Sequence, residues 1–237
     1  MTDHTIPKHV GIIMDGNGRW ANQRGMPRVE GHRKGAGRTK EIIEAAADLG
    51  IKTLTLYAFS IENWKRPHDE VITLMDLLDF YLKTEIEDLL NKGLVFKVIG
   101  NKEKLPDNIQ YLVEEAERIT GSNTGMNLMM AISYGGRDEI VRAVKRFIEK
   151  GGDMDEVNEE SFEENLDTGG VTPVDLIIRT GGEKRISNFL VWQAAYAELF
   201  FTDTLWPDFT KEEFIYAIED YKLRQRRFGM IPDKAET

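Results

Sequence analysis

The chain has 237 residues and carries 31 Lys and Arg against 41 Asp and Glu, which gives a net charge of −10. Hydrophobic residues make up 41% of the chain and charged residues 30%, which is the balance of a globular protein rather than a disordered one. An acidic chain is unsuited to holding nucleic acid along its whole surface. Cysteine is absent, which excludes disulfides, thiolate metal sites and a cysteine nucleophile.

The histidines, the apolar runs and the N-terminus limit the possible classes of protein further. The four histidines form no HExxH pair, which disfavours a zinc hydrolase. No apolar run reaches the roughly 18 residues that a membrane span needs, and the N-terminus has no secretory signal pattern. We therefore expect a cytoplasmic protein, for which the lack of cysteine is unremarkable.

Short apolar runs alternate with longer amphipathic runs along the chain. Strands are expected at 9–14, 52–59, 94–99, 126–133, 174–179 and 198–202. Helices are expected at 35–49, 69–91, 106–120, 137–150, 187–196 and 211–227. This alternation predicts one α/β domain over 1–237, with a mostly parallel sheet of about six strands flanked by helices. Ligands of such sheets bind beyond the carboxyl ends of the strands.

The segment after the first strand, residues 15–21, reads DGNGRWA. Its glycines leave backbone N–H groups open to an anion, and Arg19 offers a planar fork that suits phosphate. A carboxylate repels anions, so Asp15 is expected there only if a divalent cation bridges it to phosphate. The segment therefore predicts a cation-assisted phosphate site.

The same segment partly matches a dinucleotide-binding fingerprint, Gly16-x-Gly18-x-x-Ala21. That fingerprint requires a helix to begin at once. Gly25 and Pro27 are expected to break any helix here, so a nucleotide-dependent oxidoreductase is the disfavoured alternative.

A basic cluster follows. Seven basic residues and one acid lie between Arg19 and Lys40. Such a cluster at the start of a helix predicts an anion site, in which Arg28 and His32 are the leading candidates. A solvated basic face is the alternative for each residue.

Polar residues also follow the second and fifth strands. Residues 60–67 read SIENWKRP, in which Trp64 is expected to pack on a neighbour. Arg179 ends an apolar strand, where its charge needs a partner. Arg185 and Ser187 could complete a second phosphate cradle, although Ser187 could also cap the helix expected after it.

Three further features need an explanation. The helix at 69–91 is apolar nearly all round, so a second face must be buried against a partner subunit or an apolar ligand. Glu198 lies in an apolar stretch, either as an ion-pair member or as a second oxygen ligand for a cation. Residues 153–167 hold eight acids and no base, which is typical of a solvated connection.

Taken together, these motifs resemble the cis-prenyltransferase family in order along essentially the whole chain. The matching strings are HVGIIMDGNGRWA at 9–21, GHRKG at 31–35, YAFSIENWKRP at 57–67, YGGR at 134–137, DLIIRTGGEKRISNFLVWQ at 175–193, AYAELFFTDTLWPDF at 195–209 and RRFG at 226–229. Motifs of this length are far more specific than a lone glycine fingerprint.

The resemblance implies a magnesium-dependent transferase. Such an enzyme condenses isopentenyl diphosphate repeatedly onto an allylic diphosphate, typically farnesyl diphosphate, with cis double bonds. The implied product is a long polyprenyl diphosphate, undecaprenyl diphosphate, for the cell-wall lipid carrier. The resemblance also implies a homodimer, an apolar tunnel for the growing chain, and at most peripheral contact with the inner face of the membrane. A non-catalytic prenyl-diphosphate-binding protein is the remaining alternative.

The resemblance also assigns roles to residues. Asp15 and Asn63 would be catalytic, with Asn63 taking part in proton removal, and Mg²⁺ would lie between Asp15 and Glu198. Substrate would be bound by Gly16, Asn17, Gly18, Arg19, Trp20, Arg28, His32, Ser60, Ile61, Glu62, Trp64, Arg66, Arg179, Arg185, Ile186 and Ser187. Among these, Arg179, Arg185 and Ser187 would hold isopentenyl diphosphate.

Overall fold

Six parallel strands form one sheet in the computed structural model, which describes residues 6–153, 155 and 157–224. The strands are β1 (His9–Ile13), β2 (Thr53–Ser60), β3 (Val95–Ile99), β4 (Asn127–Tyr134), β5 (Leu176–Arg179) and β6 (Glu198–Phe201). Their order is β3-β4-β2-β1-β5-β6. All residues of β1 and β5 are buried, as expected for central strands covered on both faces. The predicted α/β class is confirmed.

The helices follow the strands in alternation. They are α1 (Asn17–Gln23), α2 (Arg28–Asp48), α3 (His68–Asn91), α4 (Asp107–Thr120), α5 (Gly136–Glu149), α6 (Glu159–Glu163) and α7 (Lys211–Leu223), with 3₁₀ turns η1 (Ile61–Lys65), η2 (Lys102–Lys104) and η3 (Trp206–Asp208). Proline directly precedes α2, α3 and α4, where its fixed φ suits a helix start and disfavours helix in the residue before it.

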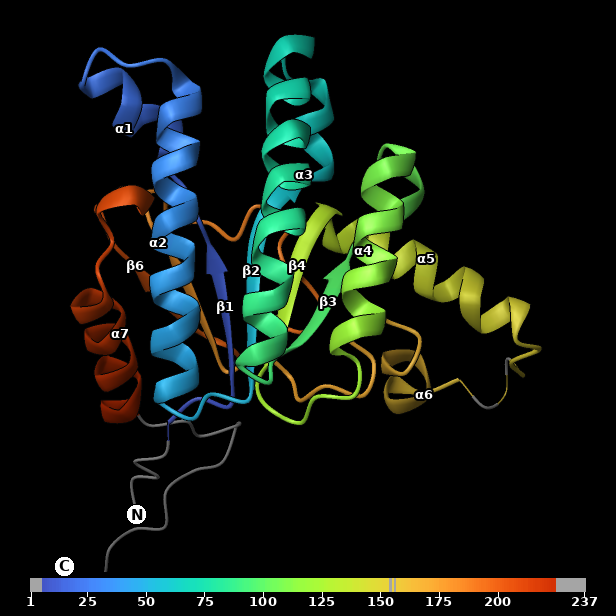
Figure 1. The fold of residues 1–237 in the computed structure, drawn as a ribbon. Coiled ribbons are helices and arrows are strands. Elements are labelled where there is room, and N and C mark those ends of the chain that lie inside the picture. Colours follow the sequence, from blue (N-terminus) through green and yellow to red (C-terminus); the bar gives the residue numbers. More distant parts are fainter. Residues whose placement is uncertain (1–5, 154, 156, 225–237) are drawn as a thin grey trace, which may run out of the picture.

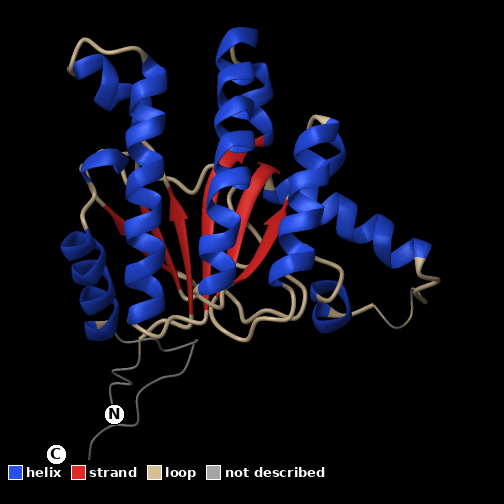
Figure 2. Ribbon diagram, in the orientation of Figure 1, coloured by secondary structure: helices blue, strands red, loops and turns tan. Residues whose placement is uncertain are grey.

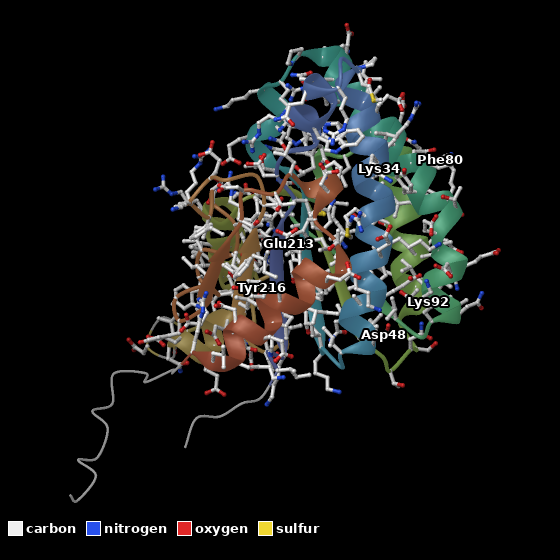
Figure 3. All side chains as sticks on the ribbon, turned by 90° about the vertical axis from the view of Figure 1, so that its left-hand side faces the viewer. Lys34, Asp48, Phe80, Lys92, Glu213 and Tyr216 are labelled. Carbon is white, nitrogen blue, oxygen red and sulfur yellow. The ribbon has the colours of Figure 1, made fainter. Side chains whose placement is uncertain are left out.

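One face of the sheet is covered by helices. There α7, α2, α3 and α4 lie side by side across the strands (Figures 1 and 2). Seen from the side, α2 with Lys34 and Asp48 lies beside α3 with Phe80 and Lys92 (Figure 3). The other face is covered mainly by irregular chain, which buries Phe189 and Leu190 completely.

Several expected elements differ in the structure. The helix expected at 187–196 is wrong: these residues form turns, and Ser187, Asn188 and Leu190 have positive φ. The second helix begins at Arg28 rather than at residue 35. The short helices α1 and α6 carry too little apolar periodicity to be seen in the sequence. The last predicted turn of the final helix and the RRFG motif lie outside the described residues.

The acidic stretch is only partly a solvated connection. Asp167 is buried and accepts hydrogen bonds from Arg142 at 2.6 and 2.7 Å and from Arg146 at 2.6 Å. This carboxylate joins α5 to the edge of the sheet, since it also accepts from the Gly100 N–H. A linear count of charges hides that role because both arginines come from the preceding helix.

The strand order sets the place of the site. After β1 the chain forms β2, β3 and β4 on one side of it, with β4 between β2 and β3, and then crosses to the opposite side of β1 to form β5 and β6. The reversal lies between β1 and β5, and crevices at such points are the usual ligand sites of open α/β sheets. The residues that follow Ile13 and Arg179 therefore meet there.

Candidate active site

The ends of β1 and β5 are tied together through Asp15 and Thr180. The Asp15 N–H donates to Thr180 Oγ1 at 3.0 Å, and that hydroxyl donates to the Asp15 carbonyl at 2.7 Å. The Trp206 N–H donates to the same carbonyl at 3.0 Å. The backbone that carries the Asp15 carboxylate is therefore fixed from two sides.

The Asp15 carboxylate faces two arginines. Arg179 Nη2 lies 2.9 Å from one oxygen and Arg19 Nη2 lies 3.1 Å from the other. Arg179 is 4% exposed, and its Nη1 donates to the Arg185 carbonyl at 2.6 Å and to Ser187 Oγ at 2.7 Å. The partner expected for the charge of Arg179 is thus Asp15, and one guanidinium joins the two predicted phosphate cradles.

The glycines around α1 are required by close packing. Gly16 has a φ of +115°, and a side chain there would meet the Leu205 backbone at 3.0 Å. A Cβ at Gly31 of α2 would overlap the Asn17 carbonyl oxygen. Because α1 begins at Asn17, directly after the loop, the expectation that Gly25 and Pro27 would prevent a helix is wrong. However, α1 has only seven residues and packs on α2.

A second cluster of basic residues lies where α2 and α3 begin. Arg28 and Arg66 both contact Glu70 Oε1, at 3.3 and 3.1 Å. Burial, together with the nearby Arg66 and Arg28, lowers the pKa of His32 to about 4, although Glu70 opposes this. His32 is therefore neutral at pH 7. The sequence did not single out Glu70; its spacing of four from Arg66 was the available signal.

Several buried polar atoms at this crevice have no partner within the protein. In the described ranges, four buried side-chain atoms have no hydrogen-bond partner within the protein: Asn17 Oδ1, His32 Nε2, Arg179 Nε and Gln193 Oε1. Such atoms are rare in folded proteins and call for an explanation. Three of the four belong to residues predicted to bind substrate, which fits a place where a polar ligand completes the hydrogen bonding.

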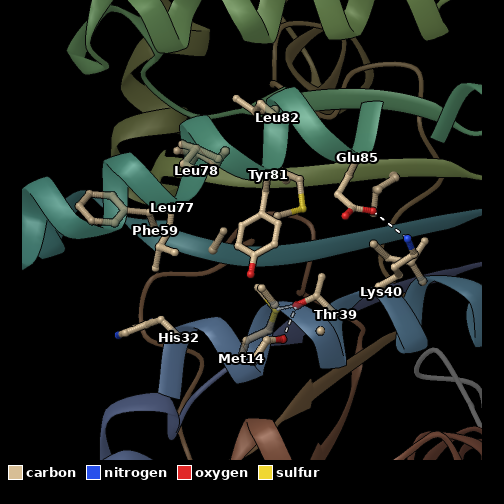
Figure 4. Close-up of a pocket in the computed structure, with 18 of the residues that line it drawn as sticks. Met14, His32, Thr39, Lys40, Phe59, Leu77, Leu78, Tyr81, Leu82 and Glu85 are labelled. Carbon is tan, nitrogen blue, oxygen red and sulfur yellow. Dashed lines mark hydrogen bonds and ion pairs between the residues drawn. The ribbon is translucent and has the colours of Figure 1, made fainter. Parts of the chain in front are cut away.

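An apolar cavity of about 360 Å³ opens from the crevice. Met14, Asn17 and His32 line its polar end, and it continues between α2, α3 and the sheet. Tyr81 points from α3 across the cavity toward Met14 and Thr39 (Figure 4). The apolar part is lined by Ile43, Phe59, Leu74, Met75, Leu77, Leu78, Leu82, Ile86, Leu89, Phe96, Leu128, Met130 and Ile132. The second apolar face of α3 therefore faces a cavity, at the place where the resemblance implies a tunnel.

Comparisons with known proteins agree with this geometry. The family profile described as "Putative undecaprenyl diphosphate synthase" matches residues 13–229. The chain belongs to this family. An isoprenyl transferase of Aquifex aeolicus is 51% identical over 229 residues, covering 97% of this chain and 98% of that protein. One of Treponema denticola is 51% identical over 222 residues, covering 94% and 97%.

Solved structures of similar proteins share the fold. A lavandulyl diphosphate synthase from Lavandula x intermedia, in complex with dimethylallyl diphosphate, superposes with a TM-score of 0.91 at 38% identity, covering 96% of this chain and all of that one. A "probable undecaprenyl diphosphate synthase" from Campylobacter jejuni gives a TM-score of 0.81 at 37% identity, covering 95% and 99%. The chain is thus a prenyltransferase by family.

The remaining predicted site residues of this family member lie in the loop after β2. Asn63 Oδ1 accepts from the Ser60 N–H at 3.1 Å, which caps η1. Trp64 donates from its ring nitrogen to Ser133 Oγ at 2.9 Å and packs edge-on against Phe59, so its expected packing is confirmed. Glu62 is exposed.

Three predicted residues lie apart from the crevice or face away from it. Trp20 donates from its ring nitrogen to Asp208 of η3 at 2.7 Å, and Ile186 is partly buried against the apolar cluster that contains Phe189 and Leu190. Glu198 begins β6 opposite Leu176, whereas Arg179 is opposite Phe201. Glu198 therefore lies roughly 10 Å from the level of Arg179 along the strands, toward their amino ends.

Asp15 and Glu198 do not meet within this chain, so a magnesium site that both would share stays a prediction. Glu198 instead pairs with Arg224 at 2.9 Å, which is the ion-pair alternative. In the part of the chain that the structure describes, no group of three or more His, Cys, Asp or Glu could hold a metal. Asp15 alone fits an ion such as Mg²⁺ that takes most of its ligands from phosphate and water.

Proposed function

We propose that this protein condenses isopentenyl diphosphate repeatedly onto an allylic diphosphate, farnesyl diphosphate, with cis double bonds. The product is then a long polyprenyl diphosphate, such as undecaprenyl diphosphate. One observation carries the proposal: a crevice rich in arginine opens directly into an apolar cavity, and Asn17 and His32 belong to both. A charged head joined to a hydrocarbon tail is the ligand that such a shape fits.

Two diphosphates need two sets of cations, and the crevice offers two. Arg19, Arg28 and Arg66 lie around His32 and α1, on the side of the cavity, and suit the allylic diphosphate. Arg179, Arg185 and Ser187 lie on the β5 side and suit isopentenyl diphosphate. Placing both substrates between these groups would convert a bimolecular encounter into a positioned reaction.

In the proposed reaction, a carbon–carbon bond forms as the allylic carbon–oxygen bond breaks. The diphosphate leaves with the bonding electrons, and a proton is lost from the isopentenyl unit; Asn63 is proposed to take part in its removal. The arginines would stabilise the charge that grows on the leaving group. Mg²⁺, held by Asp15 and the phosphates, would neutralise part of the same charge.

The cavity also explains why such a product could grow. Each condensation would push the tail further between α2 and α3, over Leu74, Leu77 and Leu78. The solved relatives are named for lavandulyl and undecaprenyl diphosphate, and we propose that the shape of the cavity limits product length in this protein. A long lipid product also suits a role in cell-wall lipid carrier synthesis.

We further propose a cytoplasmic homodimer with peripheral membrane contact. In the described ranges no helix has the length and apolar character to cross a bilayer. On α5, Val141, Val144 and Ile148 are 56%, 44% and 61% exposed and lie on one stripe, which supports a subunit contact there. A monomer in sedimentation equilibrium would contradict the dimer.

The condensation assay tests the function. The protein is incubated with Mg²⁺, farnesyl diphosphate and radiolabelled isopentenyl diphosphate, and label in the organic extract is measured. We expect label in long polyprenyl products and none when Mg²⁺ is chelated. Diphosphate binding without any condensation would instead support a non-catalytic binding protein.

A further inference from the structure

The turn after Arg185 has an unusual backbone. Ser187, Asn188 and Leu190 have φ values of 46°, 63° and 46°. Left-handed conformations are unfavourable for a residue other than glycine, because its Cβ crowds the backbone. Three of them within four residues persist only where surrounding contacts determine the backbone.

Apolar contacts fix one side of this turn. Phe189 and Leu190 are completely buried, and the Phe189 ring stacks on Tyr57 with centroids 4.6 Å apart. Both lie so close to β1 that a Cβ at Gly11 would meet them at 3.0 and 3.3 Å. These contacts anchor the apolar side of the turn to the sheet, but they do not determine the conformation of its polar side.

Asn188 fixes the polar side. Its Oδ1 accepts from the Arg137 N–H at 3.0 Å, and its carbonyl accepts from the Gly136 N–H at 2.7 Å. Its Nδ2 donates to Glu62 Oε1 at 2.9 Å. One residue thus joins the turns that follow three strands: β2 through Glu62, β4 through residues 136–137, and β5 through its own turn.

The junction is also tight. A Cβ at Gly135 would meet Asn188 Nδ2 at 2.7 Å and Ile61 Cγ2 at 2.9 Å. Asparagine suits this place because its short side chain tolerates the left-handed region and can bond nearby backbone. The neighbouring Ser187 presents Oγ to Arg179 at 2.7 Å.

We infer that Asn188 is a positioning residue for isopentenyl diphosphate. It holds Ser187 and Arg185 against Arg179 and couples them to the Glu62 loop. This inference rests on the proposed function. These hydrogen bonds of Asn188 go to Glu62, Gly136 and Arg137, and not to Arg19, Arg28 or His32 of the allylic side. Its loss should therefore affect one substrate and leave the other almost unchanged.

Asn188→Gly is the first test, because glycine keeps the positive φ and removes only the side-chain bonds. We expect the KM for isopentenyl diphosphate to rise about tenfold, since lost hydrogen bonds of this kind are worth roughly 1–2 kcal/mol. The KM for the allylic diphosphate should stay within about twofold. Asn123→Gly is the matched control: Asn123 donates to the Leu94 carbonyl at 2.7 Å, away from the crevice.

A reversed hydrogen bond gives a second test. Asn188→Asp keeps the acceptor for Arg137 but places a carboxylate against Glu62, whereas Glu62→Gln adds an amide that can donate to it. We expect the double variant to bind isopentenyl diphosphate more tightly than Asn188→Asp alone. Additive single effects, or equal rises in both KM values, would overturn the inference. Turnover by the unmodified chain in the same assay tests the proposed function separately.

Discussion

At the scale of single residues, the pair of Asp15 and Arg179 sets the chemistry of the crevice. Arg179 is almost fully buried, and Asp15 Oδ2 is the carboxylate oxygen that it contacts, at 2.9 Å. Apolar strand residues followed by an arginine were enough to predict that a partner exists. They could not identify it, because Asp15 lies 164 positions away and only the parallel pairing of β1 and β5 brings the two together.

Substitution of Asp15 should separate chemistry from stability. Asp15→Asn keeps an acceptor for Arg179, so we expect a folded protein whose kcat falls about 100- to 1000-fold, the loss typical when transition-state charge stabilisation is removed. Asp15→Ala should cost about 1–3 kcal/mol of unfolding free energy as well, because Arg179 loses its carboxylate. Turnover and urea unfolding measure both. Near-normal turnover of Asp15→Asn would refute the catalytic role.

His32 predicts a pH dependence of stability. In the unfolded chain histidine takes up a proton below about pH 6.5, whereas His32 in the folded protein does so only near a pKa of about 4. The unfolded state therefore binds more protons between these values, and stability falls as the pH is lowered through that window.

Between pH 7 and pH 4.5, the free energy of unfolding of the unmodified protein should fall by roughly 1–3 kcal/mol more than that of His32→Gln. Urea unfolding of both proteins at the two pH values measures the difference. The buried His9 is present in both, so its own titration cancels. Equal losses in the two proteins would show that His32 is not held neutral by its surroundings.

At the scale of elements, the packing of α1 on α2 positions the first residues of the crevice. Gly31 leaves no room for a Cβ beside the Asn17 carbonyl, whereas nothing lies within 4 Å of a Cβ at Gly37 on the same helix. The two glycines therefore form a matched pair for mutagenesis. Gly31 is required because a side chain would overlap α1, whereas Gly37 has no such neighbour and only weakens the helix.

We expect Gly31→Ala to lower the unfolding free energy by about 1–3 kcal/mol through overpacking, and to reduce turnover because Asn17 moves. Gly37→Ala should raise the unfolding free energy by about 0.5–1 kcal/mol. Thermal unfolding compares them directly. A stabilised Gly31→Ala variant with normal turnover would show that the contact between α1 and α2 is unimportant.

Helices and strands could be predicted from the sequence where the apolar pattern is strong. They could not be predicted where contacts with distant residues determine the backbone conformation. Apolar runs located all six strands to within two residues of their observed ends. Residues 187–196 looked helical, yet Asn188 and the buried Phe189 and Leu190 hold that segment in left-handed turns. Contacts with β1, η1 and α5 come from distant parts of the chain, so no local pattern reveals them.

At the scale of the whole molecule, charge is distributed unevenly along the chain. Residues 153–167 hold eight acids and no base, whereas residues 19–40 hold seven basic residues and one acid, so an arginine-rich crevice is compatible with the net charge of −10. The resemblance located the crevice through its motifs. It did not reveal that Glu198 begins β6 and pairs with Arg224, because a role in a family says nothing about which end of a strand a residue occupies.

The cavity predicts control of product length. Leu78 lines it, whereas Phe80 on the same helix is 55% exposed, does not line it, and lies on the outer side of α3 (Figure 3). Leu78→Trp should shorten the longest product by several isoprene units while the first condensation keeps its rate within about threefold, since only the volume of the cavity changes.

Phe80→Trp is the control and should leave the product distribution unchanged. Mass spectrometry of the extracted products, after removal of the diphosphate, compares the two variants with the unmodified protein. An unchanged distribution for Leu78→Trp would mean that the chain grows elsewhere.

The central claim is that one crevice holds the diphosphate head and the adjoining cavity receives the tail. A crystal structure of the protein with farnesyl thiodiphosphate, which resists cleavage, tests it most directly. The account predicts diphosphate oxygens within hydrogen-bonding reach of His32 and the crevice arginines, and the tail between α2 and α3 against Leu74 and Leu78. A tail bound outside that cavity, or a diphosphate bound away from Asp15 and Arg19, would contradict the account.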